Sequence, residues 1–325
     1  MSNRIEYIDA LRGFVMLLVV LGHVPMYCYH QTEGISFSLI PTTFHLALFF
    51  FISGWFVKNV KVKEKFMQLI VPTMVFYLIY CWLFDINIIE NLWDDKYKSG
   101  YWFCIVLFCF FLIMKGLEQM NDLGGAILGI ILSLCFLMLS TNAVTRLLAQ
   151  WNIPNILCLQ QWQYFVFFWV GNMARRYREQ FFHLLDDGKV MAVGVLLFLS
   201  TLLLYYQKPM GLLVIKTSFL LWGGLGAILS FAFFSKYEIA FRQTTYIGRG
   251  LQYIGRRTLD VYLLHFFFLP RNLEGLGCLI MGNDNPTVEL FVSLTIAMMV
   301  VALCLLTSNI IRLSPTLAHW VLGAK

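Results

Sequence analysis

Apolar residues recur along this chain in runs of about 20, which is the length of helix that crosses a hydrocarbon core of about 30 Å. Short segments that carry charge, Pro or Gly separate the runs. Because lipid offers no partner for backbone N–H and C=O groups, each run is expected to be helical. The pattern predicts ten transmembrane helices, over residues 9–29, 39–57, 66–84, 100–118, 124–140, 155–173, 190–206, 212–234, 251–270 and 288–311.

Composition agrees with this pattern. Hydrophobic residues make up 59% of the 325 positions and charged residues 13%, whereas about 25% of the residues in soluble domains are charged. We therefore expect an all-α polytopic membrane protein that forms a single integral-membrane domain over residues 1–325, with membrane lipids around it. The first run is too long for a signal peptide and contains Arg12, so it is expected to remain in the protein.

The basic residues indicate the orientation. With the N-terminus in the cytoplasm, 18 of the 24 Lys and Arg residues fall on the cytoplasmic side and 6 on the other. Cytoplasmic loops of membrane proteins carry such an excess. We therefore predict that both termini are cytoplasmic. The net charge of +6 forms no continuous basic face, so nucleic acid is not an expected partner.

Three ionisable residues interrupt the first span. Eleven helical steps of about 100° bring His23 within roughly 20° of Arg12, so both lie on one face. Asp9, three residues before Arg12, lies on the same stripe and can meet its guanidinium. Ionisable groups inside a membrane cost several kcal/mol unless they are paired or hydrated, so each is a functional candidate. Snorkelling to the cytoplasmic interface is an alternative explanation for Asp9 and Arg12.

Histidines of three spans are predicted to lie at similar depth. His23 and His45 each fall about 9 Å below the outer surface, and His265 about 8 Å. A packing role is the simplest explanation for a single histidine, but three in one layer favour proton transfer, because imidazole takes up and returns protons near neutral pH. No metal site is expected, since no carboxylate cluster accompanies the histidines and the eight cysteines are scattered without a C-x-x-C pair.

The connection between the second and third spans is strongly basic. It carries four lysines within eight residues, namely Lys58, Lys61, Lys63 and Lys65. They are either a positive-inside anchor or a seat for a polyanionic cytosolic ligand.

Four stretches together resemble the membrane-integral acyltransferase family 3. Arg12 followed by His23, within a segment that begins Tyr-Ile-Asp-Ala-Leu-Arg-Gly, looks like the family's first-helix signature. Residues 44–54, which close in Phe-Ile-Ser-Gly, are similar to its second-helix pattern. Gly-Tyr-Trp-Phe at 100–103, with Trp102, resembles the element that opens the fourth span. Residues 255–265, ending in Tyr-Leu-Leu-His, resemble its late helix.

The chain departs from the family pattern at three places. Ala47 stands where the family often has Pro, and Asp260 stands where Glu is common. The loop over residues 58–65 is rich in Lys, whereas many members have an Arg-rich stretch there.

The resemblance implies an O-acyltransferase that moves an acetyl or other short acyl group from cytosolic acetyl-CoA to a hydroxyl of a sugar, glycan or lipid-linked saccharide, in the inner membrane of a bacterium. His23 would be the general base, either in direct transfer or through an acetyl-imidazole. Arg12 would bind the anionic part of the donor, and His45 would orient the acceptor or stabilise the oxyanion. The supporting donor- or substrate-binding candidates are Asp9, Lys58, Lys61, Lys63, Lys65, Trp102, Asp260 and His265.

Two alternatives stay open. Asp260 either orients a histidine or acceptor, or forms a structural pair with Arg256 or Arg257, one turn before it. The whole protein is alternatively a transporter that exports a glycan or small anion along a path lined by Arg12, His23 and His45. Broken helices in corresponding halves would favour transport, and no clear inverted repeat is evident.

Overall fold

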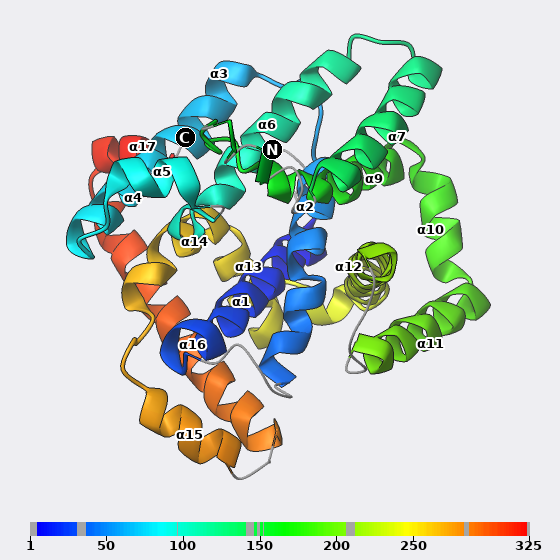
Figure 1. Ribbon diagram of the computed structural model, residues 1–325. Coiled ribbons are helices and arrows are strands. Elements are labelled where there is room, and N and C mark those ends of the chain that lie inside the picture. Colours follow the sequence, from blue (N-terminus) through cyan, green and yellow to red (C-terminus); the bar gives the residue numbers. More distant parts are fainter. Residues whose placement is uncertain are drawn as a thin grey trace. The chain divides into compact units, whose positions relative to one another are not determined.

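The computed structural model describes residues 5–30, 37–95, 97–140, 146–147, 150–151, 153–205, 212–282 and 286–323. Every regular element within these ranges is helical, and none of them is a strand, so the predicted all-α class is confirmed (Figure 1). The chain divides into two compact units. The first comprises Met1–Phe49 and Arg178–Ile310, and the second comprises Phe50–Tyr177 and Ile311–Lys325.

The first unit is built around α1, a helix most of whose residues are buried. Its partners include α13, η1, α12 and α14, and the contact with α13 is the most extensive (Figure 1). The helices of this unit are α1 (Glu6–Cys28), η1 (Phe37–Thr43), α10 (Arg178–Asp186), α11 (Gly188–Tyr205), α12 (Leu212–Lys236), η5 (Glu238–Phe241), α13 (Tyr246–Gly255), α14 (Thr258–Phe268), α15 (Glu274–Gly282) and α16 (Pro286–Ile311).

Glycines set the distance between α1 and α13. A Cβ added at Gly13 would lie 1.9 Å from the carbonyl oxygen of Leu251, and one added at Gly255 would lie 1.8 Å from that of Asp9. Both contacts are with backbone, which has no rotamer to move aside. Small residues let the backbones of membrane helices approach in this way. The glycine pair therefore brings the start of α1 against the end of α13.

The second unit has an aromatic core in which Phe50, Phe110, Phe165 and Phe168 are fully buried. Its first long helix is continuous over Val62–Leu83 and contains one π-helical turn. The elements are α3 (Val62–Lys65), η2 (Phe66–Ile70), α4 (Val71–Leu83), α5 (Ile88–Asp94), η3 (Lys98–Gly100), α6 (Trp102–Leu117), α7 (Asp122–Leu139), η4 (Leu159–Tyr164), α9 (Phe165–Arg176) and α17 (Pro315–Leu322), while α2 (His45–Trp55) begins in the first unit and ends in the second.

Five helices of the described residues are long and apolar enough to cross a membrane. Each coincides with a predicted span: Glu6–Cys28, Val62–Leu83, Asp122–Leu139, Lys216–Lys236 and Pro286–Ile311. Shorter apolar helices overlap four more predicted spans: His45–Trp55, Trp102–Leu117, Gly188–Thr201 and Thr258–Phe268. The number ten and the cytoplasmic location of both termini stay predictions.

The predicted span at 155–173 begins without α-helix, continues as the 3₁₀ segment η4 and becomes α-helical only at Phe165. Two other predicted spans, which carry His45 and His265, are interrupted as well. The span at 39–57 begins as the 3₁₀ segment η1, which contains Pro41, and becomes α-helical only at His45. Proline has no backbone N–H, so it removes one hydrogen bond from an α-helix and favours its interruption. The span at 251–270 is divided into α13 and α14. The histidines of both spans therefore lie on shorter helices than the pattern predicted.

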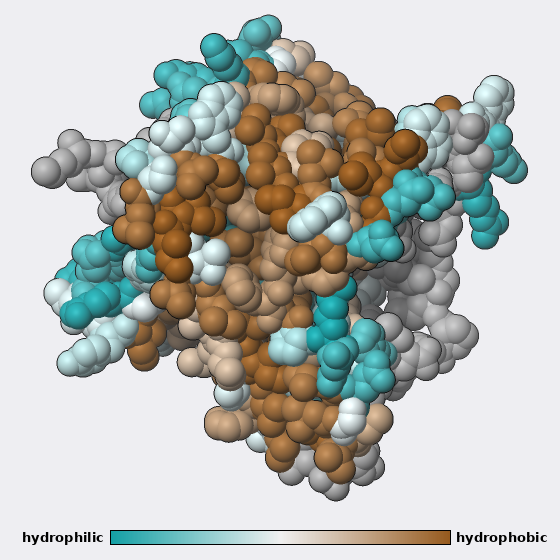
Figure 2. All heavy atoms as spheres, turned by 90° about the vertical axis from the view of Figure 1, so that its left-hand side faces the viewer, coloured by the Kyte–Doolittle hydropathy of each residue, from teal (hydrophilic) through white to brown (hydrophobic). Residues whose placement is uncertain are grey.

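Hydrophobic side chains predominate on the exposed face shown in Figure 2. Along α16, Phe291 is 72% exposed and Met299 62%. Large exposed apolar patches mark surfaces that are covered by another apolar phase or partner. Together with the long apolar helices, these surfaces identify an integral membrane protein.

Candidate active site

Two histidines from helices far apart in the sequence meet in the first unit. His23 of α1 and His265 of α14 lie with Nδ1 of His23 3.1 Å from Nε2 of His265. Their rings are nearly parallel, at an interplanar angle of 13° with centroids 5.1 Å apart. His265 is fully buried, whereas His23 is partly exposed. His23 is thus the more accessible member of the pair.

Backbone carbonyls decide which nitrogen of His265 carries the proton. Nδ1 of His265 lies 2.7 Å from the carbonyl oxygen of Tyr262 and 3.1 Å from that of Val261. A carbonyl only accepts, so in the neutral ring Nδ1 is the donor and Nε2 is the acceptor. Nε2 of His265 then accepts the hydrogen bond from Nδ1–H of His23. This assignment, inferred from the bonding pattern, makes Nε2 of His23 the basic nitrogen.

His45 is oriented by a similar contact. Its Nδ1 donates to the carbonyl oxygen of Pro41 at 2.8 Å, so Nε2 is the basic nitrogen of the neutral ring. The side chain is 5% exposed. A Cβ added at Gly22 would lie 3.9 Å from Cε1 of His45. His45 therefore packs against α1 at the residue that precedes His23.

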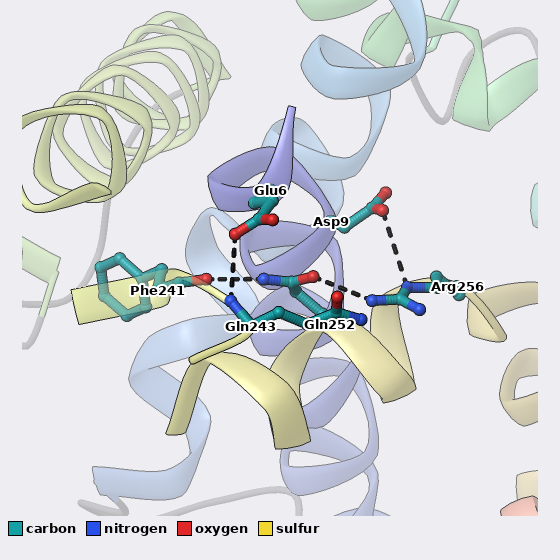
Figure 3. Close-up of polar contacts among 6 residues, drawn as sticks. All are labelled: Glu6, Asp9, Phe241, Gln243, Gln252 and Arg256. Atoms are coloured by element: carbon teal, nitrogen blue, oxygen red, sulfur yellow. Dashed lines mark hydrogen bonds and ion pairs between the residues drawn. The ribbon is translucent and has the colours of Figure 1, made fainter. Parts of the chain in front are cut away.

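The start of α1 joins α13 through a polar network (Figure 3). The carboxylate of Asp9 lies 3.9 Å from Nε of Arg256, and Arg256 donates to the side-chain oxygen of Gln252 at 2.9 Å. Gln252 in turn donates to the carbonyl oxygen of Phe241 at 2.7 Å. Glu6 accepts from the backbone N–H of Gln243 at 3.0 Å. These contacts cross-link α1 to the segment that leads into α14.

Asp9 was predicted to share a stripe with Arg12, and the structure gives it a different ionic neighbour. The ion pair of Asp9 is with Arg256, which is 247 positions away in the sequence. The physical reason is the close Gly13–Gly255 crossing, which brings the end of α13 alongside Asp9. Arg12 is partly buried, eleven residues before His23 on the same helix. The separation along the helix axis is about 16 Å.

Asp260 lies one helix turn and a half before His265 and is 2% exposed. It accepts a 2.5 Å hydrogen bond from the hydroxyl of Ser308 on α16. Arg256 lies near Asp9, and Arg257 donates to Asn309 and stacks over the ring of Tyr253. The observed contact of Asp260 thus connects α14 to α16.

The remaining candidates belong to the second unit. Lys58, Lys61 and Lys63 are exposed, and Lys61 forms an ion pair with Glu64 at 2.9 Å. Nζ of Lys65 lies 4.3 Å from the centre of the Phe111 ring. The exposed lysines lie on a surface that a charged ligand can reach.

Trp102 is 7% exposed, at the start of α6. Its ring stacks on that of Tyr164, with centroids 5.9 Å apart. It also lies 6.4 Å from the Phe50 ring, so Trp102 is part of the aromatic core of the second unit.

Glu289 is a buried carboxylate that the sequence did not single out. It is 2% exposed in the first turn of α16. The hydroxyl of Ser38 donates to it at 2.5 Å and that of Ser293 at 2.9 Å. A signal was present in the sequence, because Ser293 stands four residues after Glu289, on the same face of an apolar helix.

The fold and the site thus define an integral membrane protein whose apolar helices hold a pair of hydrogen-bonded histidines, with Nε2 of His23 as the basic nitrogen of the pair. The family model described as an acyltransferase domain, that of acyltransferase family 3, matches residues 5–307. The chain therefore belongs to acyltransferase family 3, and the protein is a membrane acyltransferase. The predicted resemblance is confirmed. No curated protein and no solved structure gives a significant match.

Proposed function

We propose that the protein transfers an acetyl or other short acyl group from cytosolic acetyl-CoA to a hydroxyl of a sugar, glycan or lipid-linked saccharide, in the inner membrane of a bacterium. The observation that carries this proposal is the oriented His23–His265 pair. An alcohol is a weak nucleophile until a base takes its proton, and Nε2 of His23 is a base at the exposed end of the pair.

His23 would accept the proton of the acceptor hydroxyl while the oxygen attacks the thioester carbonyl. The C–O bond forms, the C–S bond breaks, and the imidazolium returns the proton to the leaving thiolate. A positioned general base contributes about 10²- to 10⁴-fold to such a step. His265 would hold the His23 ring in the required tautomer throughout. An acetyl-imidazole on His23 uses the same nitrogen and is the two-step form of the same chemistry.

His45, which packs against α1 at Gly22, next to His23 in the sequence, would complete the reacting region. In the neutral ring its Nε2 accepts a hydrogen bond, so it would orient the acceptor hydroxyl. After protonation the same nitrogen would donate to the oxyanion.

The donor is long enough to use both ends of the polar face of α1. Arg12 would bind anionic groups about 16 Å from His23, which leaves room for an extended pantetheine arm. Exposed lysines such as Lys58, Lys61 and Lys63 are suited to the phosphates of the nucleotide through charge-assisted hydrogen bonds. This assignment makes the basic loop a donor-binding element in addition to a topology signal.

The first experiment asks what is transferred and from which donor. Surface glycans from cells with and without the protein are compared by mass spectrometry, and the acceptor found there is incubated with purified protein and radiolabelled acetyl-CoA. Labelled acceptor is the expected product. Acetyl-pantetheine, which lacks the nucleotide phosphates, is the matched donor and should give a higher KM. A purified protein that labels no acceptor from acetyl-CoA would contradict the proposal, and glycan flux across vesicles would then favour the transporter.

A further inference from the structure

Glu289 lies in a buried polar cluster that the proposed transfer reaction does not use. Its carboxylate accepts from the hydroxyls of Ser38 and Ser293, and the backbone N–H of Ser38 lies 3.4 Å from the second oxygen. The hydroxyl of Tyr29, at the end of α1, lies 3.3 Å from that of Ser293. Burying a carboxylate is costly unless it is hydrogen-bonded. The cluster is therefore a strong attachment between Ser38 and α16.

Ser38 belongs to η1, the short 3₁₀ segment that leads directly to His45. Within η1 the hydroxyl of Thr43 donates to the carbonyl oxygen of Ile40 at 2.8 Å. The carbonyl oxygen of Pro41 accepts from Nδ1 of His45. Side-chain contacts thus attach η1 to Glu289 through Ser38 and to the His45 ring through the carbonyl of Pro41.

The last turn of η1 rests on α1. A Cβ added at Gly22 would lie 2.7 Å from the methyl carbon of Thr42, so the Thr42 side chain packs directly against the backbone of α1. A 3₁₀ helix has weaker hydrogen-bond geometry than an α-helix and is rarely long. We therefore expect the contacts of η1 with its neighbours to hold it in position. Loss of the Ser38–Glu289 hydrogen bond should then displace the Pro41 carbonyl.

We propose that Glu289 is a positioning residue for His45, which it orients by holding Ser38 and thereby the carbonyl of Pro41. The proposal rests on the proposed function for its consequence in catalysis. Glu289 itself is enclosed by protein hydroxyls and does not touch the reacting atoms. Its effect on the reaction passes through η1 to the His45 ring.

The kinetic test compares variants of the full-length protein in detergent. Ser38→Ala and Glu289→Gln should each lower kcat for acyl transfer by about 10- to 100-fold, because displacement of a reacting group by about 1 Å has effects of this size. The KM for the acyl donor should stay within about threefold, since neither Ser38 nor Glu289 is among the residues proposed to bind the donor. Ser293→Ala is the matched control. It removes a hydroxyl from the same carboxylate but keeps the Ser38 contact, and it should change kcat by less than about threefold.

A double-mutant cycle separates positioning from general support of the fold. In a His45→Gln background, Ser38→Ala should cause less than about a twofold further loss of kcat, because the residue that it positions is already gone. A loss as large as in the wild-type background would overturn the proposal, and so would an unchanged kcat in both Ser38→Ala and Glu289→Gln.

A second readout does not depend on activity. Diethyl pyrocarbonate modifies the basic nitrogen of histidine, and peptide mass spectrometry gives the rate at His45. We expect Ser38→Ala to change this rate by about fivefold or more and Ser293→Ala to leave it unchanged. An unchanged rate in Ser38→Ala overturns the positioning role. A changed rate in a protein whose wild type transfers no acyl group supports the attachment and contradicts the proposed function.

Discussion

Adding one methyl group at Gly255 should disturb both the stability and the chemistry of the first unit. The Cβ of an alanine there would lie 1.8 Å from the carbonyl oxygen of Asp9 and 2.8 Å from its carbonyl carbon. Both atoms belong to the backbone of α1, so no side-chain rotation relieves the contact. Gly255 is also the last residue of α13, and α14, which carries His265, begins three residues later.

The size of the displacement follows from the geometry. Real Cβ atoms essentially never approach another atom within 3.0 Å, so the helices must separate by about 1.2 Å along this contact. Overpacking of this kind costs about 1–3 kcal/mol of unfolding free energy. A shift of about 1 Å passed on to His265 would stretch its 3.1 Å contact with His23 beyond hydrogen-bonding range, with a loss of about 10²-fold in kcat.

Gly250→Ala is the matched control for Gly255→Ala. Gly250 lies on the same helix, and a Cβ added there meets nothing within 4 Å. Since alanine favours helix over glycine by about 0.5–1 kcal/mol, this variant should be as stable as wild type or slightly more so. Thermal unfolding in detergent and the rate of acyl transfer are measured for both. Equal unfolding temperatures and equal rates in the two variants would refute the close-crossing argument.

Three further predictions concern the site and its supports. His265→Leu removes the acceptor that fixes the His23 tautomer, so kcat should fall by about 10²- to 10⁴-fold with donor affinity retained; steady-state kinetics with a binding assay checks this, and undiminished kcat would contradict it. The second prediction concerns the basic loop, in which Gln replaces Lys58, Lys61, Lys63 and Lys65 together. The KM for acetyl-CoA should rise by about tenfold or more, and the salt dependence of this KM should weaken. An unchanged KM would leave these lysines as topology signals. Ser308→Ala removes the hydroxyl donor of the buried Asp260 carboxylate and should lower the unfolding free energy by about 1–3 kcal/mol in denaturant melts, a loss that wild-type stability in the variant would disprove.

The apolar runs in the sequence revealed the helices because each run must satisfy its own backbone hydrogen bonds in lipid, whichever helices are its neighbours. The five long apolar helices coincide with predicted runs. Asp9, Arg12 and His23 all lie on the single helix α1, as the sequence predicted. Depth along a helix can also be read from sequence, and it pointed to His23 and His265 as residues of one region. Their contact at 3.1 Å joins positions 242 apart, and no local pattern specifies it.

The features that the sequence did not reveal depend on which helices are neighbours. Asp9 pairs with Arg256 because Gly13 and Gly255 let α1 and α13 cross closely. A glycine in an apolar run does not indicate which other helix will pack against it. The role of Glu289 depends on Ser38, which is 251 positions away. The division between α13 and α14 falls at Arg256 and Arg257, two charged residues that the predicted span 251–270 had included.

Nε2 of His23 is the proposed base for acyl transfer, and His23→Ala tests this role most directly. The kcat for transfer of radiolabelled acetyl from acetyl-CoA is measured alongside equilibrium binding of the same donor, with the unfolding temperature as a check on the fold. We predict a fall in kcat of about 10²- to 10⁴-fold with donor affinity within about threefold of wild type. Transfer at the wild-type rate by a folded His23→Ala variant would contradict it.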